Sequence, residues 1–195
     1  MDIPEITSAN VVSVVPATIS SKPASGHTLT STGFTRKSGA RTEETGRLGE
    51  RLVYEYLLKQ KASGEILSVS WVSENAKKEK INPQGSAALG YDMEFLGKDE
   101  IRYYVEVKSS EGDLSQGIKF NISDFECNFA KEHEGAYFIY YVSGVRSKEP
   151  QVSILNSFLL DGEINTDQYA VEAKTSYTIF ANIVGDGSKS LKHDS

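Results

Sequence analysis

The sequence has few of the residues that build disulfides and zinc sites. Its 195 residues include one cysteine, Cys127, and three histidines, His27, His133 and His193. A single cysteine excludes an internal disulfide framework, so we expect a reducing compartment inside the cell, either the cytoplasm or the nucleus. Two of the histidines lie in segments that we expect to be tails, and a zinc site is therefore not expected.

Long hydrophobic runs are also absent. The apolar run Val11 to Val15 is too short for the core of a signal peptide or for a membrane span. The chain begins with Met1-Asp2-Ile3-Pro4-Glu5, which is acidic where a signal peptide is basic. We therefore expect a soluble protein that is neither secreted nor inserted into a membrane.

Positive charge is scarce. The chain has 21 Lys and Arg against 27 Asp and Glu, which gives a net charge of −6. Proteins that coat DNA non-specifically usually carry a basic surface, so the balance argues against that class. It leaves open a nuclease whose acidic residues gather around metal ions.

Composition divides the chain into three parts. Residues 1–40 are rich in Ser, Thr, Ala and Gly without a sustained period, which predicts a disordered arm that is free to recruit protein partners. Residues 41–160 carry the periodic segments of a globular domain. Residues 161–195 form a C-terminal extension that we expect to be partly disordered, with Tyr177 to Phe180 as one candidate strand and Gly185 to Ser195 as a frayed tail.

The domain alternates helical and extended patterns. The expected elements are a helix from Thr42 to Gly64, strands at 65–73, 91–96 and 101–110, a helix from Ser123 to Gly135, and strands at 136–142 and 151–155. A strand pair followed by a helical crossover into another strand predicts an α/β sandwich with a mixed central sheet flanked by helices. The segment 74–90 between the first two strands is expected to be a polar loop.

The third expected strand carries charge where a central strand usually carries Val or Ile. Side chains alternate along a strand, so Glu106 and Lys108 share one face and Val105 and Val107 share the other. Asp92 opens the neighbouring antiparallel strand, and a short turn at 97–100 joins the two. We therefore expect two carboxylates and a lysine to converge at one edge of the sheet.

Such a grouping is suited to phosphodiester chemistry. Paired carboxylates hold Mg²⁺ through hard oxygen ligands, and a lysine beside the metal orients or deprotonates water and neutralises charge on a phosphate. Glu-x-Lys triplets also arise by chance and form ordinary solvated strand faces, so the triplet depends on its context. Here Glu106 lies fourteen residues after Asp92, a spacing of the PD-(D/E)xK nuclease signature.

Three further charged positions have two interpretations each. Glu50 lies beside the apolar stripe of the first helix and either points inward at the sheet edge or is solvated. Lys77 to Lys80 is either a solvated charge run or a contact for a phosphate backbone. Glu126 forms an expected capping box with Ser123, and we interpret it as a capping residue rather than a catalytic one.

Several motifs together resemble a known family, the C-terminal domain of the plant protein NO VEIN, over about residues 42–158. They are Gly46-Arg47-Leu48-Gly49-Glu50, Leu89-Gly90-Tyr91-Asp92, Val105-Glu106-Val107-Lys108-Ser109, Phe120-Asn121-Ile122-Ser123 with Glu126, Phe129-Ala130, and the aromatic strand after Gly135. The resemblance implies a restriction-endonuclease-like (PD-(D/E)xK) fold with an αβββαβ core. It leaves the activity to be argued from the residues.

The superfamily pattern implies a role for each matching position. Asp92 and Glu106 would be ligands of Mg²⁺ or Mn²⁺, with help from the Val107 carbonyl, and Lys108 would position or activate the water. Glu50 would orient that water or hold a second metal ion. The position before Asp92 is Tyr91 where the superfamily name has proline, and that proline does no chemistry.

Two functions follow from these observations. The first is a metal-dependent nuclease that hydrolyses phosphodiester bonds of nucleic acid, with DNA favoured, by metal-activated water. The second is a catalytically silent module of the same fold that acts in nucleic-acid or protein interaction. The filled site favours the first, and the acidic balance favours the second.

Overall fold

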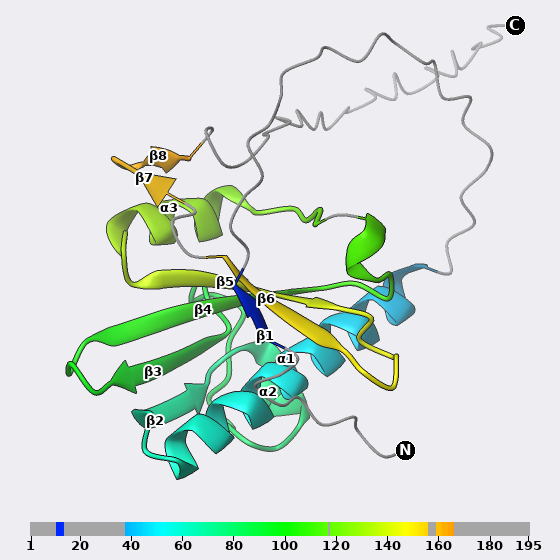
Figure 1. The fold of residues 1–195 in the computed structure, drawn as a ribbon, viewed down its shortest axis with the longest axis horizontal. Coiled ribbons are helices and arrows are strands. Elements are labelled where there is room, and N and C mark those ends of the chain that lie inside the picture. Colours follow the sequence, from blue (N-terminus) through cyan, green and yellow to red (C-terminus); the bar gives the residue numbers. More distant parts are fainter. Residues whose placement is uncertain (1–10, 14–37, 117, 156–158, 166–195) are drawn as a thin grey trace, which may run out of the picture.

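The computed structural model describes residues 11–13, 38–116, 118–155 and 159–165, which form three layers with a mixed sheet in the middle (Figure 1). The elements in chain order are β1 (Val11–Ser13), α1 (Ser38–Ala62), β2 (Ile66–Trp71), α2 (Glu74–Lys78), β3 (Met93–Gly97), β4 (Arg102–Ser109), a 3₁₀ helix (Leu114–Gln116), α3 (Asp124–Glu132), β5 (Tyr137–Ser143), β6 (Gln151–Leu155), β7 (Leu159–Leu160) and β8 (Glu163–Ile164). The predicted helix, three strands, helix and two strands are all confirmed.

The sheet is mixed, as predicted. Its strand order is β1-β6-β5-β4-β3-β2, in which five longer strands are extended at one edge by the three-residue β1. β2, β3 and β4 are antiparallel neighbours, whereas β4 and β5 run parallel across the α3 crossover. Met93 is paired with Val105 and Glu106 with Ile139, so the start of β3 lies beside the middle of β4.

One face of the sheet packs against α1. Leu52, Val53 and Leu57 of that helix join Val105 and Val107 of β4 in a single core cluster, and each of the five is at most 8% exposed. Full burial of one such side chain contributes about 1.5–3 kcal/mol. The cluster explains why the apolar stripe of the helix and the apolar face of β4 could both be identified from sequence.

The other face packs against α3. Ala130 of α3 clusters with Tyr137 and Ile139 of β5, and Phe129 is partly buried against them. Figure 1 shows α3 and the small β7–β8 hairpin on the opposite side of the sheet from α1 and α2. Glu106 and Lys108 alternate with Val105 and Val107, so they lie on this α3 face.

The turn between β3 and β4 forms as its residues predict. The Asp99 carboxylate accepts a hydrogen bond from the Ile101 backbone N–H at 3.1 Å and another from the Tyr103 hydroxyl at 2.6 Å. Glu100 has a φ of 63° at the tight bend. This hairpin fixes the register that brings the start of β3 beside the middle of β4.

The structure also differs from the predictions at several places. Segment 74–90, expected from the sequence to be a loop, contains the short helix α2 with Ser73 as its N-cap. Five residues are too few to show a helical period in the sequence. α1 begins at Ser38, four residues before the expected start, and Val11–Ser13 of the expected disordered arm form β1. The candidate strand Tyr177–Phe180 and the tail Gly185–Ser195 lie outside the described residues.

Within the described ranges, no helix is both long and apolar enough to span a membrane.

Candidate functional site

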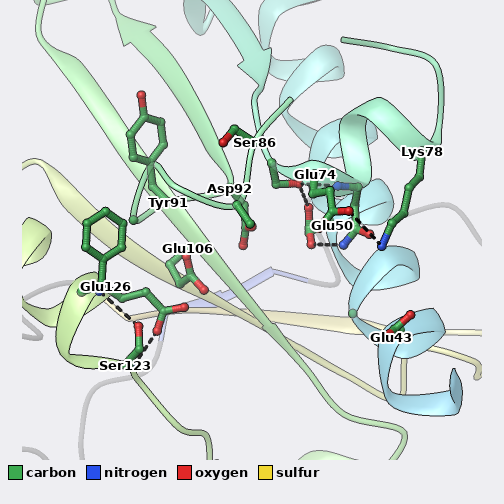
Figure 2. Close-up of a pocket in the computed structure, with 16 residues that line it drawn as sticks. Glu43, Glu50, Glu74, Lys78, Ser86, Tyr91, Asp92, Glu106, Ser123 and Glu126 are labelled. Carbon is green, nitrogen blue, oxygen red and sulfur yellow. Dashed lines mark hydrogen bonds and ion pairs between the residues drawn. The ribbon is translucent and has the colours of Figure 1, made fainter. Parts of the chain in front are cut away.

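A cleft of about 380 Å³ opens where β3 begins, between α1 and α2 on one side and the start of α3 on the other. Its lining includes six acidic residues, Glu43, Glu50, Glu74, Asp92, Glu106 and Glu126. Lys78 is the one lysine among the lining residues. Figure 2 shows Asp92 and Glu106 in the middle of this cleft, with Glu50 and Glu126 on either side of them. The cleft is therefore strongly acidic.

Asp92 is held by the backbone on both sides. Its N–H donates to the Val105 carbonyl at 2.9 Å, and its own carbonyl accepts from the Val72 N–H at 2.8 Å. One carboxylate oxygen, Oδ2, accepts a hydrogen bond from the Val107 N–H at 2.9 Å. These bonds fix the side chain against β4, one residue before β3 starts.

The ionised form of Asp92 is disfavoured in this position. Burial raises the pKa of its carboxyl well above the usual range, and the nearby charges of Glu106 and Glu50 raise it further. The Val107 N–H opposes the shift without cancelling it. The Lys108 charge also opposes the rise caused by these two carboxylates and does not cancel it, so a further cation beside Asp92 would favour its ionised form.

Glu106, in the middle of β4, lines the same part of the cleft as Asp92. It is 6% exposed, and its Oε1 accepts a hydrogen bond from Lys108 Nζ at 2.7 Å. Burial raises the pKa of Glu106 to about 8, with Lys108 opposing that shift and the charge of Glu126 adding to it. The sequence prediction that Asp92, Glu106 and Lys108 converge is therefore matched by their positions.

Lys108 is held as an ammonium. Its Nζ bridges Glu106 Oε1 at 2.7 Å and Glu126 Oε1 at 3.1 Å. Burial works to lower the pKa of Lys108, but the charges and hydrogen bonds of the two glutamates outweigh burial and raise it. A lysine in this state donates hydrogen bonds and supplies positive charge, and it is not poised to accept a proton.

Glu126 has a second role that the sequence prediction missed. The capping box is confirmed, because the Ser123 hydroxyl accepts from the Glu126 N–H at 3.2 Å and Glu126 Oε2 accepts from the Ser123 N–H at 2.7 Å. The other oxygen, Oε1, is the one that binds Lys108. One oxygen of the Glu126 carboxylate therefore caps α3, and the other binds Lys108.

Glu50 points inward, so the solvated interpretation is wrong. Its residue is 6% exposed, and its carboxylate accepts hydrogen bonds from Trp71 Nε1 at 2.7 Å, from Asn75 Nδ2 at 2.6 Å and from the Ser73 hydroxyl. Burial raises the pKa of Glu50, whereas these three donors lower it. The network ties α1 to the end of β2 and the start of α2.

The lysine-rich segment after β2 has mixed roles. Glu79 pairs with Arg47 and Arg51 and joins this segment to α1. Lys78 lies in the lining of the cleft and is 3.8 Å from Glu74, a weak pair of half-exposed side chains. Lys77, Lys78 and Lys80 are all exposed, as expected of a solvated charge run, and contact with a phosphate backbone stays a prediction.

The donor set suits a hard cation held by few protein ligands. The described residues contain no group of three or more His, Cys, Asp and Glu that could hold a metal ion. Asp92 and Glu106 supply two carboxylates, and Mg²⁺ is commonly bound through one or two carboxylates with water completing the shell. The N–H and C=O of a strand residue point to the same edge, so the Val107 carbonyl lies on the Asp92 side as well.

Comparisons with known proteins identify the family. The family model described as "Protein NO VEIN, C-terminal" matches residues 49–155, which is more than half of the chain and includes Glu50, Asp92, Glu106, Lys108 and Glu126. Protein NO VEIN of Arabidopsis thaliana is 32% identical over 103 residues, which are 53% of this chain and 3% of that protein. No solved structure matches the chain. The chain belongs to the family of the C-terminal domain of Protein NO VEIN.

Proposed function

We propose that the domain is a nuclease of the PD-(D/E)xK type that hydrolyses phosphodiester bonds of nucleic acid, with DNA favoured, in the presence of Mg²⁺ or Mn²⁺. The observation that carries this proposal is that Asp92 and Glu106 line one acidic cleft and that Lys108 binds Glu106 beside them. Both carboxyl groups have raised pKa values, which is typical of functional sites.

The fold supports the superfamily assignment. The order α1, β2, β3, β4, α3, β5 agrees with an αβββαβ core, with the short α2 inserted between β2 and β3. Asp92 precedes β3 directly, and Glu106 and Lys108 lie within β4. These positions support the superfamily pattern, which has its Asp on the second core strand and its Glu-x-Lys on the third, with Asp92 one residue ahead of its strand.

The metal would be held by Asp92 and Glu106, with the Val107 carbonyl as a third oxygen. When bound, Mg²⁺ would polarise a phosphate oxygen and make a bound water more acidic. Burial and the neighbouring carboxylates disfavour the ionised form of Asp92, and a bound divalent cation would offset that repulsion.

The chain's own residues have separate tasks. Lys108, kept cationic by Glu106 and Glu126, would neutralise charge that develops on the phosphate and orient the attacking water by donating a hydrogen bond. Glu126 would fix the direction of the Lys108 ammonium. Glu50 would position α2 through Asn75, since its oxygens already accept three hydrogen bonds.

Cleavage assays on plasmid and single-stranded DNA with Mg²⁺ or Mn²⁺ test the proposal. Asp92→Ala and Lys108→Ala should each lower the cleavage rate by at least about a hundredfold, the size expected for loss of a preorganised charge. Lys98→Ala, in the exposed β3–β4 turn, is the matched control and should cut at the wild-type rate. Cutting that survives in both cleft variants would exclude this site as its source.

A catalytically silent interaction module is the second candidate. One observation favours it: Glu106 Oε1, an oxygen that a metal would need, is already engaged by Lys108. In that case nucleic acid or a protein would bind without being cut, and Asp92→Ala would leave binding unchanged. Binding by wild type and Asp92→Ala, measured beside the cleavage assay, separates the two candidates.

A further inference from the structure

Phe125 is an exposed aromatic ring in the lining of the acidic cleft. Its residue is 54% exposed, and it is the one aromatic among the large hydrophobic residues that are exposed in the described ranges. It lies in the first turn of α3, directly before Glu126. Phe129, one turn later, is instead partly buried in the core cluster of that face. Burial in the core therefore does not account for Phe125.

The Phe125 ring lies close to Gly90, in the loop that precedes Asp92. Gly90 has a φ of +78°, and a Cβ atom added there would lie 2.9 Å from Phe129 Cβ and 3.4 Å from Phe125 Cε1. The Gly90 carbonyl accepts a hydrogen bond from the Tyr137 hydroxyl at 3.2 Å, which anchors this loop to β5. The ring of Phe125 therefore lies beside this loop in the lining of the cleft, whereas the tight approach to Gly90 is made by Phe129.

The charges around Phe125 oppose binding through phosphates alone. The cleft lining has six carboxylate side chains and one lysine, and the whole chain carries a net charge of −6. A duplex is held largely by cationic contacts to its phosphates, and its bases are stacked inside the helix where an aromatic side chain does not reach them. A single strand offers the faces of its bases, and stacking on an aromatic ring is independent of charge and of sequence.

We propose that Phe125 stacks on an unpaired base, and that the cleft therefore takes a single-stranded segment or frayed end in preference to a duplex. This inference rests on the proposed nuclease function and names the class of its substrate. A cleft of about 380 Å³ is of the size that encloses a small organic group such as one nucleotide. A nucleotide whose base stacks on Phe125 would lie in the same cleft as the carboxylates of Asp92 and Glu106.

Fluorescence anisotropy with phosphorothioate oligonucleotides, which resist hydrolysis, tests this preference in Mg²⁺ buffer. A labelled single strand should bind at least tenfold more tightly than a blunt duplex of the same sequence. Phe125→Ala and Phe125→Leu should each weaken single-strand binding by about tenfold, the usual loss for one stacked base, and leave duplex binding unchanged. Ile101→Ala is the matched control, since Ile101 is 48% exposed at the β3–β4 turn, and it should bind as wild type does.

Phe125→Trp adds a readout that does not depend on cleavage. Trp71 is the chain's one tryptophan and is 1% exposed, so a second, open indole in the cleft should be quenched when a single strand stacks on it. Equal binding of single strand and duplex, wild-type affinity in Phe125→Leu, or unchanged indole emission would each overturn the inference. If duplex DNA is cut and the Phe125 variants cut normally, the inference fails while the nuclease function stands. If no nucleic acid is bound or cut at all, both fail.

Discussion

The Asp92 carboxylate accepts a 2.9 Å hydrogen bond from the backbone N–H of Val107, which lies between Glu106 and Lys108 on β4. One bond thus ties the start of β3 to the strand that carries the other two residues of the proposed site. Backbone hydrogen bonds with Val72, directly after β2, and with Val105 of β4 also hold Asp92 on either side. The position of Asp92 is therefore fixed by hydrogen bonds from its side chain and from its backbone.

Asp92→Asn should stabilise the metal-free protein. The raised pKa of Asp92 means that the ionised form is disfavoured by burial and by Glu106 and Glu50, and asparagine removes the charge while its carbonyl oxygen still accepts from Val107. We expect the free energy of unfolding to rise by about 1 kcal/mol, a size common when a strained functional site is neutralised. Urea unfolding in EDTA measures it. Asp161→Asn, in an exposed turn, should change nothing, and a destabilised Asp92→Asn would contradict the account.

Two substitutions of Glu126 should distinguish its role in capping α3 from its role in holding Lys108. Glutamine at this position still accepts from the Ser123 N–H, so Glu126→Gln should stay within about 0.5 kcal/mol of wild type. Glu126→Ala loses the cap and should cost about 1 kcal/mol. Both variants remove the negative charge that holds Lys108, so both should lower the cleavage rate by a similar factor and lower the pKa of Lys108. Unfolding curves and a pH–rate profile report the two effects. A fully active Glu126→Gln would show that the pair with Lys108 is structural only.

Asn75→Ala should loosen the Glu50 network. Asn75 Nδ2 is one of three donors to the Glu50 carboxylate, and a buried acceptor that loses a donor costs about 1–3 kcal/mol. The Asn75 backbone N–H still bonds to the Ser73 cap in the variant, so α2 keeps its start. Trp71 donates to the same carboxylate and is the chain's one tryptophan, so its emission should shift. Lys77→Ala, exposed on the same helix, is the control and should leave both readouts unchanged.

Acid should weaken the contact between α1 and the segment after β4 through Glu111. Arg41, Arg146 and Thr45 bond to this carboxylate and lower its pKa from 4.5 to about 2. A lowered folded-state pKa adds stability that is full above pH 4.5 and is lost as pH falls from 4.5 to about 2. Glu111→Gln should therefore be less stable than wild type above pH 4.5, and the two stability curves should converge as pH falls to about 2. Glu132→Gln, an exposed glutamate on α3, should keep the wild-type curve; if both variants match wild type, the Glu111 cluster has no role in acid stability.

Local patterns were sufficient to predict the elements that position the site. The alternation in β4, the turn chemistry around Asp99 and the Ser123 cap each act over a few residues, so a sequence records them directly. For Glu50 the pattern left two interpretations, and the hydrogen bonds from Trp71 and Asn75 decide for the inward one. Asp92 and Glu106 could be placed together because an antiparallel hairpin with a short turn leaves little freedom in register.

The missed features depend on contacts between distant segments. Glu126 and Lys108 are eighteen residues apart, and only the crossover between β4 and β5 brings them together. Glu50 and Asn75 are twenty-five residues apart and meet through α2, whose five residues give too little periodicity to be recognised. The capping box alone accounts for a glutamate at position 126, so nothing in the sequence indicated that Lys108 is a second partner of Glu126.

Divalent-cation binding by Asp92 and Glu106 is the central claim, and a Mn²⁺ titration followed by electron paramagnetic resonance tests it most directly. The account predicts that wild-type protein removes free Mn²⁺ at a site that Mg²⁺ competes for. Asp92→Asn and Glu106→Gln should each weaken binding at least about tenfold, as expected for the loss of one charged ligand from a pair. Glu132→Gln should bind as wild type does. Wild-type Mn²⁺ affinity in both cleft variants would contradict the account, and the silent-module function would replace it.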